Sequence, residues 1–84
     1  MSYWINKLLY DMNPALLERL KAKDESLFTE YPVTQEEQVA LWKCIDEKAF
    51  KQLHDMGGVI PVLLFTFARQ SGCSVGEYTE LLKH

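Results

Sequence analysis

The feature that most constrains this 84-residue chain is an apolar run at residues 59–68, which follows the pair Gly57-Gly58. A membrane-spanning helix needs about 20 apolar residues, so the run is too short to cross a bilayer. A strand is compatible with this composition, but the helical patterns on both sides favour a buried helix with Pro61 in its first turn. The sequence therefore predicts an all-α fold packed around a buried apolar helix at about residues 59–70.

Start and stop signals divide the rest of the chain into short helices. Side-chain oxygens at several positions are placed to accept hydrogen bonds from the first turn of a helix. Two of these, Thr34 and Ser74, precede a glutamate by three residues, which is the spacing of a capping box. We expect five or six short helices in one domain over residues 1–84. The expected N-caps are Asn13 (followed by Pro14), Asp24, Thr34, Asp46 (opening a helix that Gly57-Gly58 closes) and Ser74.

Charge and composition exclude several classes of protein. Twelve acidic and nine basic residues give a net charge of −3 and no basic stripe, so we expect no nucleic-acid partner. The cluster Arg19, Lys21 and Lys23 is interpreted as a solvated face. The first eleven residues lack an apolar segment and a cleavage site, so they do not resemble a signal peptide. We therefore expect a cytoplasmic protein with reduced cysteines and no membrane contact.

Residues able to hold a metal or drive catalysis are few. The two histidines are His54 and His84, and a non-haem iron site needs two histidines and a carboxylate around one ion. We expect His84, at the end of the sequence, to be frayed and unable to hold a metal. Because so few other ligands are available, no metal or cofactor site is expected in this chain alone. His54 precedes the glycine pair, where the helix dipole favours a histidine. The alternative is that His54 is a polar group at a ligand pocket.

The two cysteines, Cys44 and Cys73, do not have the spacing of a metal site. Cys73 directly precedes the expected cap Ser74, where helix N–H groups would lower the pKa of a thiol. A catalytic thiol also needs a base, and no base is placed beside it by the sequence. A disulfide between the two cysteines rests on their even number alone. One hypothesis for function is an enzyme that acts through Cys73 or His54.

One ordered set of residues suggests a family. The set covers most of the chain, from about Lys7 to Tyr78, and its most specific part is the block E-R-L-K-A-K-D-E-S at residues 18–26. This pattern resembles the small alpha subunit of protocatechuate 4,5-dioxygenase, of the extradiol aromatic-ring-opening family. The other matching positions are Leu27-Phe28, Tyr31, Val33-Thr34, Glu36-Glu37, Ala40-Leu41, Asp46, Leu53, Met56-Gly57-Gly58, Leu63, Ala68, Gly72-Cys73-Ser74 and Glu77.

The resemblance implies an accessory role. In that family a large subunit holds Fe(II) through two histidines and a glutamate, and the helical alpha subunit forms a lid that shapes the aromatic substrate pocket. The implied partners are an iron-bearing large subunit and a catechol-like molecule at the shared interface, with no catalytic, cofactor or metal residue in this chain. Trp4 and Trp42 are expected anchors, because aromatic residues dominate interface hot spots. The expected pocket or interface residues are His54, Gly57, Gly58, Ile60 and Phe67.

The chain differs from the family after the glycine pair. Val59, Ile60 and Pro61 stand where family members tend to carry an asparagine and aromatic residues. The chain also ends one helix beyond Gly72, earlier than the family's alpha subunits usually do. These differences motivate the alternative function, a free-standing helical interaction or small-ligand-binding domain that keeps the fold without dioxygenase activity. Such a domain could pair as a homodimer.

Overall fold

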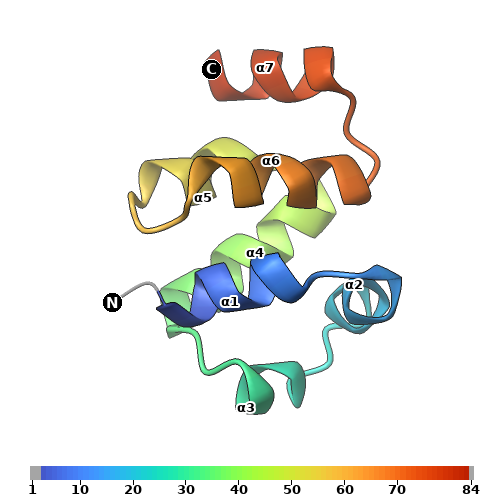
Figure 1. Cartoon of the computed structure of the whole chain (residues 1–84), viewed down its shortest axis with the longest axis vertical. Coiled ribbons are helices and arrows are strands. Elements are labelled where there is room, and N and C mark those ends of the chain that lie inside the picture. The colour runs from blue at the N-terminus through green and yellow to red at the C-terminus, as the bar shows by residue number, and fades with distance from the viewer. Residues whose placement is uncertain (1–2, 84) are drawn as a thin grey trace.

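The computed structural model describes residues 3–83, and within that range it contains seven helices and no strand (Figure 1). The all-α prediction is confirmed, and α3, a single turn, brings the number of helices above the expected five or six. No helix in the described range is long and apolar enough to cross a membrane. The bounds are α1 Tyr3–Asp11, α2 Pro14–Lys21, α3 Leu27–Glu30, α4 Gln35–Glu47, α5 Phe50–Asp55, α6 Pro61–Gln70 and α7 Val75–Lys83.

Three of the expected N-caps are confirmed. The Asn13 side chain accepts a hydrogen bond of 2.9 Å from the Leu16 N–H, with Pro14 at the first position of α2. Thr34 and Glu37 form both halves of a capping box at the start of α4. The Ser74 hydroxyl accepts a hydrogen bond of 3.1 Å from the backbone N–H of Glu77 in the first turn of α7. Local side-chain chemistry therefore fixes where these helices begin.

The cap expected at Asp46 is wrong. Asp46 lies inside α4, and its carboxylate accepts hydrogen bonds of 2.8 Å from Lys23 Nζ. The chain instead breaks at Lys48, which adopts the left-handed conformation with φ of 56°. Asp24 does cap the short turn expected there, which leads into α3: its side chain accepts from the Ser26 N–H at 3.0 Å, and its carbonyl accepts from the Leu27 N–H at 3.2 Å. An aspartate can satisfy a turn or an ion pair as well as a helix start, and spacing alone does not distinguish these roles.

α6 is packed on three sides and exposed on the fourth. It contacts α1, α5 and α7, which lie below, behind and above it in Figure 1. Leu64, Phe67 and Ala68 on its inner side are buried, whereas Val62 is exposed. The prediction that this segment is a buried central helix is therefore only partly right: α6 is central, but no element covers its outer side. The uniform apolar composition conceals this difference between its faces.

An aromatic cluster joins the last three helices. The ring of Phe50 in α5 lies 5.9 Å from that of Phe67 in α6 and 6.0 Å from that of Tyr78 in α7, measured between centroids. Phe65 of α6 also contacts Tyr78 at 5.4 Å. Edge-to-face and tilted pairs of this kind contribute about 0.5–1.5 kcal/mol each beyond the burial of their surface. The cluster holds α6 between α5 and α7.

Gly57 ends α5, as predicted, in a conformation that favours glycine. Its φ is +79°, and the space around an added Cβ is open, so replacement with alanine introduces backbone strain without a clash. We expect Gly57→Ala to lower the free energy of unfolding by about 1 kcal/mol. Gly76 in α7 is the matched control: its Cβ site is also open, and alanine there should raise the unfolding free energy by about 0.5–1 kcal/mol. Urea denaturation of both variants tests this, and equal effects would contradict it.

A hydrogen bond between α1 and the end of α3 makes stability depend on pH at both extremes. The Tyr31 hydroxyl donates to Asp11 Oδ2 at 2.7 Å, which lowers the pKa of Asp11 and raises the pKa of Tyr31. The Asp11 contribution is present above its ordinary pKa of 3.8 and is lost as pH falls through the lowered folded pKa. The Tyr31 contribution is present below its ordinary pKa of 10.0 and is lost as pH rises through the raised folded pKa.

Tyr31→Phe removes the hydroxyl and keeps the ring. We expect the Asp11 carboxyl to titrate at a higher pH in this variant, because the donor that stabilises its charged form is gone. An NMR titration of the Asp11 carboxyl carbon in both proteins measures the shift. An unchanged Asp11 titration would show that the hydrogen bond is not formed in solution.

Candidate functional site

Asn6 of α1 fixes the loop between α5 and α6. Its Nδ2 donates to the Gly58 carbonyl at 2.9 Å, and its Oδ1 accepts from the Ile60 N–H at 2.8 Å. The two ends of one amide thus satisfy a backbone acceptor and a backbone donor more than fifty positions away in the sequence. This clamp holds the loop, and with it the start of α6, against α1.

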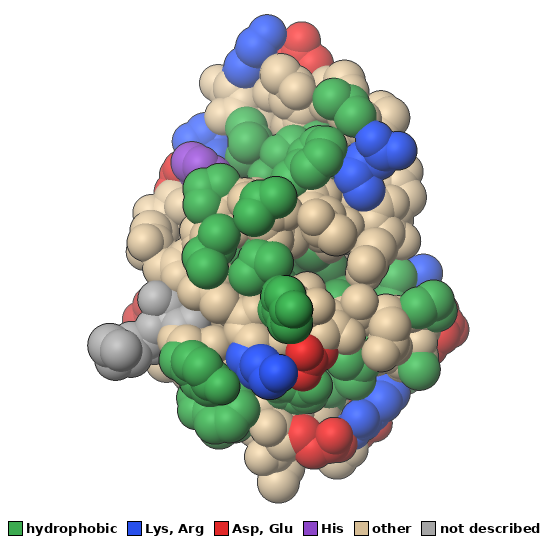
Figure 2. Space-filling view, in the orientation of Figure 1, with side chains coloured by type: hydrophobic (Ala, Val, Ile, Leu, Met, Phe, Trp, Pro, Cys, Tyr) green, Lys and Arg blue, Asp and Glu red, His purple; other side chains and the backbone are tan. Residues whose placement is uncertain are grey.

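An exposed apolar surface, the α1–α6 face, lies on both sides of this clamp. Tyr10 is 73 % exposed, Val62 63 %, Tyr3 59 % and Ile60 49 %, and half-buried Leu63 completes the face. Hydrophobic side chains gather over α1 and α6 on this side of the molecule (Figure 2). Exposed apolar surface that is contiguous, unlike scattered single residues, is typical of an interaction site.

The α1–α6 face contains a shallow hollow of about 340 Å³, lined by Tyr3, Asn6, Lys7, Tyr10, Ile60 and Leu63. The ammonium group of Lys7 is neutralised by Asp11 at 3.2 Å and lies 5.8 Å from the centre of the Tyr10 ring. The lining side chains include no thiol, imidazole or carboxylate. Chemically, the hollow is suited to accept an apolar or aromatic group.

Three of the expected site residues lie next to the face. Gly58 and Ile60 are held by the Asn6 clamp, and Gly57 lies immediately before them. His54 is exposed in the last turn of α5, as its sequence context predicts, with Nδ1 3.3 Å from Asp55 Oδ1. Its contact is therefore with its neighbour on the helix, and it does not line the hollow.

Phe67 and the two tryptophans differ in exposure. Phe67 is completely buried in the aromatic cluster, so this structure places it in the core and not at a pocket or interface. Trp4 is 40 % exposed, and its ring contacts that of Tyr3 at 5.0 Å, beside the face. Trp42 is half-buried against Phe28 at 5.7 Å, and its buried Nε1 has no hydrogen-bond acceptor in the described part of the chain.

Both cysteines are buried free thiols, so there is no disulfide between them. Burial raises the pKa of Cys44 to about 12. Burial also raises the pKa of Cys73, and the nearby carboxylate of Glu77 adds to the effect. The expectation that helix N–H groups lower the Cys73 pKa is therefore wrong, because desolvation and a negative neighbour outweigh them. The hypothesis of an enzyme with a reactive Cys73 therefore loses its support.

Metal-ligating side chains are dispersed. Over residues 3–83, no three His, Cys, Asp or Glu side chains come close enough together to hold a metal ion. His84, the second histidine, lies outside the described residues.

Comparison with protein-family models, with curated proteins and with solved structures gives no match for this chain.

Of the six residues that line the hollow, the expected site residues included only Ile60; the five that were missed are Tyr3, Asn6, Lys7, Tyr10 and Leu63. A signal for two of them is present, since Tyr3 and Tyr10 are seven residues apart and share one side of the first helix. Together with Ile60 they would have indicated a second apolar surface besides the core. The Asn6 clamp has no local signal, because its partners are distant in the sequence.

Removing the clamp should destabilise the protein and free the loop. We expect Asn6→Ala to lower the unfolding free energy by about 1–2 kcal/mol, because it leaves the Gly58 carbonyl and the Ile60 N–H without their partner. Hydrogen exchange at the Ile60 amide should also become faster. Gln52→Ala, which shortens an exposed amide side chain on α5, is the control. Unchanged exchange at Ile60 in Asn6→Ala would contradict the clamp.

Proposed function

We propose that this chain is a non-catalytic accessory subunit that binds a larger protein through the α1–α6 face. The observation that carries the proposal is the hollow that Tyr3, Tyr10, Ile60 and Leu63 line together, in which the first three side chains are exposed. Covering such side chains is favourable by about 25 cal/mol for each Å² of apolar surface removed from water. The Asn6 clamp fixes the loop in advance, so that less conformational entropy is lost on binding.

The residue types of the face support an interface with a protein. Tyrosine and tryptophan are enriched at the hot spots of interfaces. In α1, Tyr3 and Trp4 contact each other at the start of the helix, and Tyr10 lies near its end. Arg69 lies two turns after Val62 in α6 and forms no salt bridge within residues 3–83. An arginine at the edge of an apolar surface is a frequent interface contact.

The resemblance to the protocatechuate 4,5-dioxygenase alpha subunit names the class of partner. The partner would be a large extradiol-type subunit that supplies Fe(II) and the ring-opening chemistry. This chain would act as a lid, with Ile60, Leu63 and the tyrosines near the shared interface, where they would exclude water and pack against an aromatic substrate. The fixed loop at Gly57, Gly58 and Ile60 supports this role, because a lid must keep its shape.

The alternative function is a free-standing domain that pairs with its own copy through the same face. One observation favours it: Lys7 is neutralised by Asp11, so the hollow carries no net charge to repel a second copy. The two functions differ in what covers the face, and measurements of mass and iron content distinguish them.

Val62→Lys tests the accessory role. The side chain is exposed in the first turn of α6, next to Leu63 of the hollow, so we expect folding to be retained, whereas a charge placed in the interface should reduce binding about tenfold or more. Val75→Lys, at a residue of α7 that is 50 % exposed and outside the face, is the matched control. The measurement is co-purification of the tagged chain and both variants from native lysate, with mass spectrometry, iron analysis and a catechol ring-cleavage assay of the eluate.

The predicted result is an iron-bearing partner with ring-cleavage activity that is recovered with the wild-type chain and with Val75→Lys but not with Val62→Lys. Elution of an iron-free homodimer that Val62→Lys dissociates would support the alternative instead. Equal recovery of a partner by both variants would show that the α1–α6 face is not the interface.

A further inference from the structure

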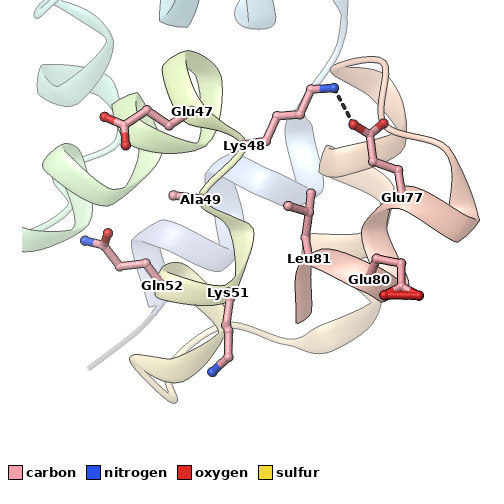
Figure 3. Close-up of a pocket in the computed structure, with 8 residues that line it drawn as sticks. All are labelled: Glu47, Lys48, Ala49, Lys51, Gln52, Glu77, Glu80 and Leu81. Atoms are coloured by element: carbon pink, nitrogen blue, oxygen red, sulfur yellow. Dashed lines mark hydrogen bonds and ion pairs between the residues drawn. The ribbon is translucent and has the colours of Figure 1, made fainter. Parts of the chain in front are cut away.

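A second hollow lies on a different surface, between α5 and α7 (Figure 3). Its volume is about 610 Å³, which is within the range of small-molecule pockets, about 300–1,000 Å³. The α5 helix has six residues and is therefore only about 9 Å long, so one wall of the hollow is too short to cradle a helix of several turns. The lining residues are Glu47, Lys48, Ala49, Lys51, Gln52, Glu77, Glu80 and Leu81.

The floor of the hollow is apolar and one end is closed. Leu81 of α7 lies between that helix and the segment from Lys48 to Lys51 (Figure 3), and Ala49 also lines the hollow. Lys48 reaches across to Glu77 Oε2 at 2.5 Å and joins the α4–α5 junction to α7. This ion pair closes one end, so a bound molecule would enter from the side where Lys51 and Glu80 lie.

Both lysines that line the hollow form salt bridges, whereas the carboxylate of Glu47 forms none within the described part of the chain. Lys48 is paired with Glu77, and Lys51 with Asp55 at 2.6 Å, so both ammonium groups are already neutralised. Glu47 forms no salt bridge within residues 3–83. It is also the last residue of α4, whose final turn contains no basic residue. The C-terminal end of a helix carries partial negative charge, so Glu47 and the helix dipole act together to attract a cation.

We propose that this hollow binds a small organic cation with an aromatic or aliphatic body, such as an arylalkylamine. The apolar body would pack on Ala49 and Leu81, while its ammonium group would lie near Glu47. Both ammonium groups of the lining are paired, and so are Glu77 with Lys48 and Glu80 with Lys83 at 3.8 Å; the remaining charge is that of Glu47, which favours a cation over an anion. This inference does not depend on the accessory role, because it concerns the chain alone and a different surface.

The test uses 2-phenylethylammonium as the probe and two molecules of similar shape as comparisons, neutral 2-phenylethanol and anionic 3-phenylpropionate. Each is titrated into the isotope-labelled chain, and chemical shifts are followed by NMR. We expect saturable shifts at Ala49 and Leu81 with the cation, weaker binding of the alcohol by at least about fivefold, and no saturation with the anion. Glu47→Gln should weaken the cation at least about threefold, whereas Glu25→Gln, an exposed control on another surface, should not.

Several outcomes would overturn the proposal. Equal binding of the three molecules would remove the role of charge. Shifts confined to Tyr3, Tyr10 and Leu63 would place the probe on the α1–α6 face. Shifts at Ala49 and Leu81 that depend on protein concentration without any probe would show that a second copy fills the hollow.

Discussion

The structure depends on how α6 is buried. Three helices surround it, and the aromatic contacts of Phe67 and Phe65 with α5 and α7 fix it between them. Within residues 3–83 no element lies over the fourth side, and small domains bury only about 60 % of the surface of their unfolded chains. The apolar composition of α6 therefore produces both the core and the exposed α1–α6 face. The same shortage of covering elements accounts for the proposal that another protein completes the burial.

Much of the fold was predictable because its signals are local. The caps Asn13, Thr34 and Ser74 act within one helical turn, and the break at Gly57 requires a left-handed backbone that glycine supplies. The failure at Asp46 arises because its carboxylate binds Lys23 instead of a helix start. The break at Lys48 had no signal, since lysine seldom adopts the left-handed conformation that it has here.

The candidate site was less predictable, because it depends on which residues meet in space. The sequence indicated the loop at Gly57, Gly58 and Ile60, but the Asn6 clamp joins residues more than fifty positions apart. Phe67 could not be separated from Ile60 by hydropathy, although one is completely buried and the other half exposed. Only the packing of α1 against α6 decides this difference. The raised pKa of Cys73 has the same origin, since burial depends on packing and outweighs the local helix N–H groups.

The two surfaces described above have different character. The α1–α6 face is aromatic and carries one internally neutralised ion pair, which suits a broad contact with a protein. The α5–α7 hollow has an apolar floor and carboxylates at its border, which suits a small organic cation. A chain of this size can therefore carry an interface and a ligand site on separate helices, held by the same α6.

The central claim is that the α1–α6 face is covered by a partner. The most direct measurement is hydrogen exchange by mass spectrometry on the complex from native lysate, compared with the free chain. The account predicts that residues 3–11 and 58–70 become protected, while α4 (Gln35–Glu47) exchanges as in the free chain. Protection confined to α4 or to α7 (Val75–Lys83), with residues 3–11 and 58–70 unchanged, would contradict it.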